Sequence, residues 1–131
     1  MTPKMQEKHL FEYAVIRVVP RVEREEFINV GVVVYCKKHK YLHTRINLNP
    51  DKLQAFYAKI DIDELRENLL AFERICAGEK SGGPIAQLPV ADRFRWLTAT
   101  RSTVVQTSKV HPGLSLDVDQ TLEKLFNEQV L

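Results

Sequence analysis

The stretch from residue 27 to residue 36, Phe-Ile-Asn-Val-Gly-Val-Val-Val-Tyr-Cys, constrains the fold more than any other part of the chain. Its β-branched and aromatic residues, bounded by charged residues on both sides, predict a central β-strand. Because side chains alternate across a strand, Asn29 and Gly31 are expected on one face, together with Phe27, Val33 and Tyr35. The opposite face is expected to pack against the core, and it consists of Ile28, Val30, Val32, Val34 and Cys36.

Two more strands are predicted beside the central one. Residues 10–19 alternate in polarity and stop at Pro20, because proline cannot donate to a strand ladder. Residues 41–48 alternate in the same way. Short charged connections join the three segments, which is typical of an antiparallel meander. The predicted core faces of the two outer strands are Ala14, Ile16 and Val18, and Leu42, Thr44, Ile46 and Leu48.

Capping residues mark three helix starts. Asn49, Asp61 and Asp117 each precede a segment with helical spacing of apolar residues, and their side-chain oxygens can accept hydrogen bonds from free amides. Pro50 fits the first position of the first of these helices. Gly78 is expected to end the second helix in the left-handed conformation.

The remaining segments are assigned from side-chain alternation, turn residues and composition. Residues 89–97 predict a short helix, although their alternation also fits a strand. Residues 103–110 predict a fourth strand, followed by a turn at residues 111–113. Residues 1–9 are expected to be frayed, and residues 78–89, rich in glycine and proline, to form a flexible connection.

These elements predict a single α+β domain spanning residues 1–131. Its antiparallel sheet would have about four strands, formed by the N-terminal three-strand meander and a fourth strand after the helices, with the helices packed on one face. The opposite sheet face would then be exposed to solvent. Its candidate binding residues are Tyr13, Tyr35, His43, Arg45 and Asn47.

Composition limits the cellular setting. A net charge of +2 is too small to indicate a polyanion partner. Cys36 and Cys76 lie far apart and form no C-x-x-C pair, and the polar N-terminus lacks the apolar stretch of a signal peptide. No apolar run approaches the roughly 20 residues that span a bilayer. We therefore expect a cytoplasmic protein with reduced thiols and no membrane association.

Asn29 and Gly31 point to a candidate site. A buried amide without a partner costs about 1–3 kcal/mol, so Asn29 must bond either to another chain segment or to a ligand. A structural brace for the loop around Arg101 is one interpretation. A second is an anion site, in which Arg17 and Arg101 converge near Asn29. The full candidate cluster is Arg17, Asn29, Gly31, Arg101, Ser102 and Gln106.

Motifs of known catalytic classes are missing from the sequence. It has no H-E-x-x-H, no G-x-S-x-G and no Cys/His ligand set, so we expect no metal and no cofactor. One alternative is a small phosphate-handling enzyme that uses arginine, asparagine and hydroxyl groups. Another is a nucleic-acid or nucleotide-phosphate binding protein, because arginines and aromatic rings on an open sheet can bind phosphates and stack on bases.

The pattern also resembles a known family. It includes Tyr13 through Arg17, Phe27-x-Asn29-x-Gly31, Arg93-Phe94, Leu97-Thr98, Arg101-Ser102, Gln106-x-Ser108 and a closing leucine-rich helix. Over nearly the whole chain, from about residue 11 to residue 126, this is similar to the bacterial domain-of-unknown-function family 3037. The resemblance implies a small bacterial protein of unassigned activity, encoded beside kinase-like proteins of the HipA toxin type. We therefore expect an accessory or protein-interaction module that docks a protein partner, and such a kinase-like protein is the candidate partner.

Overall fold

The computed structural model describes residues 7–101 and 103–131. The elements follow the order β1 (His9–Val18), η1 (Val22–Arg24), β2 (Ile28–Cys36), β3 (Tyr41–Ile46), α1 (Pro50–Phe56), α2 (Ile62–Ala77), η2 (Lys80–Gly82), η3 (Pro84–Gln87), α3 (Val90–Leu97), β4 (Val105–Thr107), β5 (His111–Ser115) and α4 (Val118–Gln129). The η elements are short 3-10 helices.

Five antiparallel strands form one sheet, in the order β3-β2-β1-β4, with β5 also paired to β1. Because β2 takes one edge of β1, β4 and β5 share the other: β4 pairs with residues 16–18 of β1 and β5 with residues 9–13. The α+β class and the N-terminal meander are confirmed.

Strand β5 was not predicted. The segment predicted as a turn, His111-Pro112-Gly113, is extended and paired with β1. Pro112 is tolerated because β5 is an edge strand that pairs only with β1. Gly113 lies opposite Phe11, and a Cβ there would meet that ring at 2.5 Å. Glycine is therefore required at this position, because a side chain would prevent β5 from lying so close to the Phe11 ring of β1.

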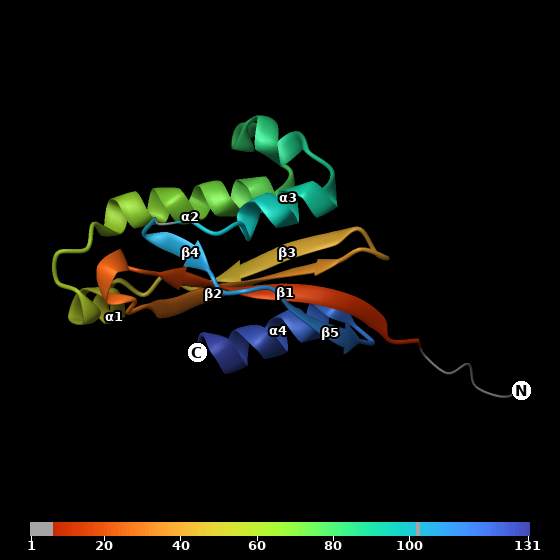
Figure 1. The fold of residues 1–131 in the computed structure, drawn as a ribbon, viewed down its shortest axis with the longest axis horizontal. Coiled ribbons are helices and arrows are strands. Elements are labelled where there is room, and N and C mark those ends of the chain that lie inside the picture. The colour runs from red at the N-terminus through yellow and green to blue at the C-terminus, as the bar shows by residue number, and fades with distance from the viewer. Residues whose placement is uncertain (1–6, 102) are drawn as a thin grey trace, which may run out of the picture.

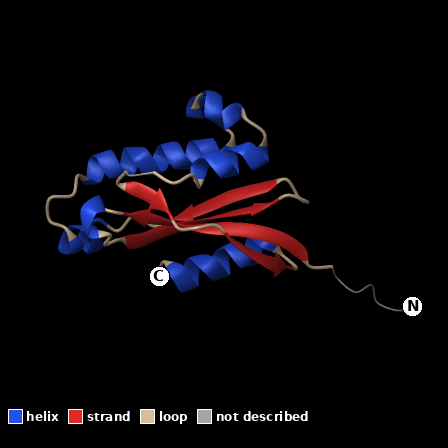
Figure 2. Ribbon diagram, in the orientation of Figure 1, coloured by secondary structure: helices blue, strands red, loops and turns tan. Residues whose placement is uncertain are grey.

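Helices cover both faces of the sheet, and here the prediction of a single covered face is wrong. In Figures 1 and 2, α2 and α3 lie on one side of the sheet and α4 lies on the other. Leu122, Leu125 and Phe126 of α4 pack with Val32 and Val34 in a second core. The physical reason is that β2 is apolar on both sides, so each side requires a covering element.

A β-bulge in β2 explains which side chains point where. Ile16 pairs with Gly31 but Arg17 pairs with Asn29, so Val30 is an extra residue. Val30 lies in the core beneath α2, and a Cβ on Gly31 would meet Ile16 of the same core. Asn29 instead bonds to α4. The expectation that Asn29 and Gly31 share a face is therefore wrong.

The predicted helix starts are confirmed by their caps. Asn49 and Asp61 each accept a hydrogen bond from the amide three residues on, and Asp117 accepts from Asp119 and Gln120. Gly78 ends α2 with φ of 71°. The ambiguous segment 89–97 contains the helix α3.

The connection after α2 contains η2 and η3. Within it Ala86 is buried, and the Gln87 side chain donates to the Glu79 carbonyl. No helix in the described part of the chain is long and apolar enough to cross a membrane.

Candidate functional site

Three of the predicted site residues meet in one row across the sheet. Arg17 of β1 lies opposite Asn29 of β2 on one side and opposite Gln106 of β4 on the other. We call these three residues the polar row. Arg17 alternates with Ile16 and Val18, which face α2, and so it belongs to the α4 side.

The polar row has unsatisfied hydrogen-bonding groups. Asn29 donates through Nδ2 to the Gln129 carbonyl at 3.0 Å, but its buried Oδ1 has no partner, and neither has the buried Nε of Arg17. The Arg17 guanidinium stacks on the Phe27 ring at 3.9 Å. Burial lowers the pKa of Arg17, because water that would stabilise its charge is removed. Through its hydrogen bond to the Gln129 carbonyl, Asn29 links β2 to the C-terminal end of α4.

Arg101 does not join this row. Its guanidinium stacks on Trp96 at 3.9 Å and donates to the Trp96 carbonyl, on the α2 and α3 side of the sheet. The predicted convergence of Arg17 and Arg101 near Asn29 is therefore wrong, as is the idea that Asn29 braces the Arg101 loop. Ser102, the neighbouring candidate, lies outside the described residues.

The sheet face that was expected to be open is largely occupied by α4. Arg45 forms an ion pair with Glu123 of α4, and Tyr13 packs against the second core. Tyr35 lies on the other face, where it is 6% exposed and stacks on Phe94.

His43, Arg45 and Asn47 are the members of the predicted face that are exposed, and Arg45 is the one that pairs with α4. Tyr41 at the same edge donates to Asp119 at 2.8 Å, and desolvation and this contact raise its pKa. The sheet platform that base stacking would use is therefore covered.

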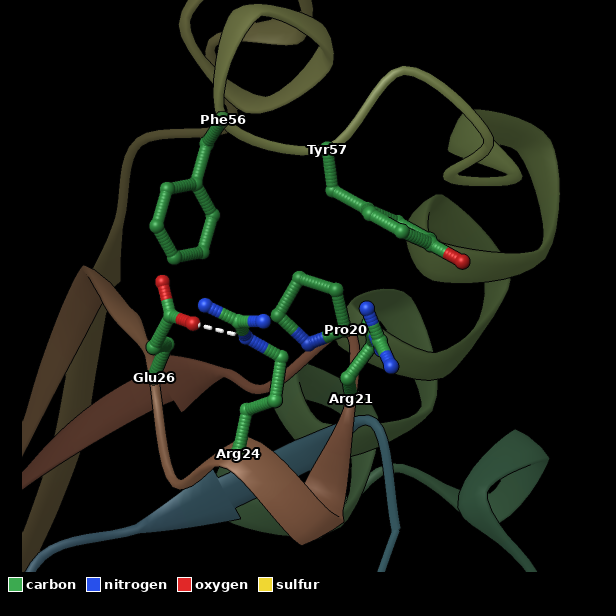
Figure 3. A pocket seen from close by; sticks show the side chains of 6 residues that line it. All are labelled: Pro20, Arg21, Arg24, Glu26, Phe56 and Tyr57. Atoms are coloured by element: carbon green, nitrogen blue, oxygen red, sulfur yellow. Dashed lines mark hydrogen bonds and ion pairs between the residues drawn. The ribbon is translucent and has the colours of Figure 1, made fainter.

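A surface that sequence analysis missed lies where η1 meets the end of α1. A cavity of about 170 Å³ opens there, and Figure 3 shows Phe56 and Tyr57 facing Pro20 and Arg24 across it. Arg21, Arg24 and Phe56 line this cavity. Val22 of η1 lies between the two arginines along the chain, and Phe27 follows η1 and contacts the Arg17 guanidinium. We call the set Arg17, Arg21, Val22, Arg24, Phe27 and Phe56 the arginine end.

Local charge pairs leave one arginine of this surface free. Arg21 pairs with Glu23 at 3.0 Å, and Arg24 pairs with Glu26. Within residues 7–101 and 103–131, Arg17 has no carboxylate partner. The alternation of arginine and glutamate in residues 21–26 was the available signal, but it was interpreted only as a charged connection.

Within the described ranges, no three His, Cys, Asp or Glu side chains are grouped so that they could hold a metal ion. The two cysteines are buried and unpaired.

The Cys76 thiol should be almost inert. It is buried on the inner face of α2, and desolvation raises its pKa to about 12. Because the thiolate is the reactive form, an aromatic disulfide reagent at pH 8 should label the folded protein far more slowly than a small free thiol. In guanidinium, which unfolds the protein, the reagent should label both cysteines and release two equivalents of the aromatic thiolate per chain. Rapid labelling of the folded protein would contradict the buried placement.

Comparison with known proteins supports the family assignment. The family model described as "Protein of unknown function (DUF3037)" matches residues 13–130, nearly the whole chain. The chain belongs to the DUF3037 family. No curated protein and no solved structure matches it. The DUF3037 match includes the polar row and the arginine end.

Proposed function

We propose that this protein is an interaction module that docks a protein partner through the arginine end. The observation that carries the proposal is the grouping of exposed apolar side chains with arginines at one place. Val22, Phe27 and Phe56 are each exposed by between 37% and 43%. Arginine and aromatic residues dominate the binding energy of many protein interfaces, because they combine a large apolar area with directional donors.

Arg17 suits the centre of such an interface. Its guanidinium already rests over the Phe27 ring, so little conformational entropy would be lost on binding. A carboxylate of the partner would supply the negative charge that the Arg17 guanidinium lacks among the described residues. The partner we propose is a kinase-like protein of the HipA type, which the family resemblance suggests.

The proposal is tested by co-expression with a HipA-type kinase-like protein, which the family resemblance implies is encoded beside this chain in the native host. We expect the two proteins to purify as a near-stoichiometric complex. Phe27→Ala should weaken the complex at least tenfold, because it removes an exposed ring and the support of Arg17. Isothermal titration calorimetry gives the dissociation constants.

Leu70→Ala is the matched control. Leu70 is 37% exposed but lies on α2, away from the arginine end, and its variant should bind like the wild type. Equal affinity of all three proteins would contradict docking at this surface. Retention on polynucleotide that falls steeply with salt would favour the nucleic-acid alternative instead.

A further inference from the structure

A groove runs between α2 and β4 on the side of the sheet away from α4. Its cavity measures about 250 Å³. The apolar lining comes from Phe72 and Ile75 of α2, Leu97 of α3 and Val105 of β4, and the first three are almost fully buried. Such a lining suits an aliphatic side chain.

Arg101 lies at the rim of this groove. Its guanidinium is fixed by stacking on Trp96 and by donation to the Trp96 carbonyl. No carboxylate in the described ranges pairs with it. Burial lowers its pKa, because part of its hydration is lost without a compensating negative charge. A ligand carboxylate would supply the negative charge that compensates for this lost hydration.

The outer edge of β4 offers free backbone groups beside the groove. Val104 accepts from Val19, and Ser108 donates to Val15, so the even-numbered residues of this segment direct their backbone groups toward β1. Val105 and Thr107 therefore direct theirs outward. The Thr103 hydroxyl already donates to the Val105 carbonyl. Within the described ranges, the Val105 amide and both backbone groups of Thr107 have no hydrogen-bond partner, and no described strand pairs with this edge.

We propose that this groove binds the C-terminal segment of a partner protein, which adds to β4 as an antiparallel strand and places its terminal carboxylate on Arg101. The direction follows from the chain order. Arg101 precedes β4, and in an antiparallel pair the C-terminal end of the added strand lies beside the N-terminal end of its neighbour. The last side chain of the peptide then enters the apolar groove. This site lies apart from the arginine end and does not depend on it.

Trp96, the single tryptophan of the chain, provides the measurement. It is 39% exposed and contacts Arg101, so its fluorescence should change when the groove fills. The probe is the hexapeptide Thr-Val-Thr-Val-Thr-Leu with an acetylated N-terminus and a free carboxylate. We expect a saturable change, and at least tenfold weaker binding for the same peptide with a C-terminal amide.

Protein variants test the arginine. Arg101→Ala should weaken binding of the carboxylate peptide at least tenfold and leave the binding of the amide peptide nearly unchanged. Arg95→Ala is the control, because Arg95 is exposed on the same helix as Trp96 but does not line the groove. Circular dichroism checks that each variant is folded. If Arg101→Ala does not fold, two measurements still test the proposal. One is the binding of both peptides to Arg101→Lys, and the other is the comparison of the two peptides on the wild-type protein.

Backbone methylation tests strand addition separately. Methyl groups on alternate peptide amides remove the donors that face either β4 or solvent. We expect one methylated series to lose binding and the alternate series to keep it. Equal binding of the two series would overturn the proposal, as would equal binding of the amide and carboxylate peptides. Binding of acetyl-leucine as tight as that of the hexapeptide would show a small-carboxylate site instead and would also overturn it.

Discussion

Replacing Phe94 by alanine should lower the free energy of unfolding by about 3–5 kcal/mol, the range for a fully buried phenylalanine. Phe94 is 1% exposed and stacks on Tyr35 with ring centroids 5.0 Å apart, so it joins α3 to the central strand. The loss combines a cavity with the missing aromatic contact. For a domain of ordinary stability, about 5–15 kcal/mol, this is a large fraction of the total.

Urea unfolding followed by Trp96 fluorescence measures this effect, since Trp96 lies on the same helix. Phe56→Ala is the matched control, because Phe56 is a phenylalanine that is 37% exposed at the end of α1. We expect it to cost about 1 kcal/mol or less. Similar losses for the two variants would mean that Phe94 is not part of the core.

The second large effect is expected for Gly31→Ala, which should cost about 1–3 kcal/mol through overpacking. An added Cβ would lie 2.7 Å from the Arg45 carbonyl oxygen and 2.9 Å from Cγ1 of Ile46. The first of these atoms belongs to the backbone of β3 and cannot move without disturbing the β2–β3 pairing. Gly31→Val should cost more.

A double-mutant cycle separates the two contacts of Gly31. Ile46→Ala removes Cγ1, so it should relieve part of the clash, but the carbonyl contact persists. The double variant Gly31→Ala, Ile46→Ala should therefore remain less stable than Ile46→Ala alone in urea unfolding. If the two proved equally stable, the close approach of the β3 backbone would be refuted.

The sequence was sufficient to predict the elements that depend on contacts between residues close together in the chain. The caps Asn49, Asp61 and Asp117 were found from the sequence because each acts on amides within three residues. The faces of β1 were predicted because alternation there is uninterrupted, with Ala14 and Ile16 in one core and Val15 in the other.

Non-local effects account for the errors. The extra residue Val30 shifts the alternation of β2, and nothing in its side chain marks it as a bulge. The apolar stripe of α4 was predicted, but a stripe does not specify which sheet face it covers. Valines on both faces of β2 were the available signal that two cores exist.

The candidate site was predicted only in part, because it too depends on contacts between distant parts of the chain. Arg17, Asn29 and Gln106 were named from residue type alone, and it is strand register that brings them together. Arg101 was assigned to the same place, but its loop carries it to Trp96 on the opposite side of the sheet. Loop paths of this kind depend on tertiary contacts that a sequence pattern does not encode.

The placement of α4 has a consequence for synthesis. Val32, Val34 and Cys36 are made early, but the helix that shields them comes more than 80 residues later in the chain. A ribosome-bound chain would therefore carry an aliphatic strand surface in contact with water until α4 has been translated. That interval is when a holding chaperone would be most useful, and when aggregation of the nascent protein is most strongly favoured.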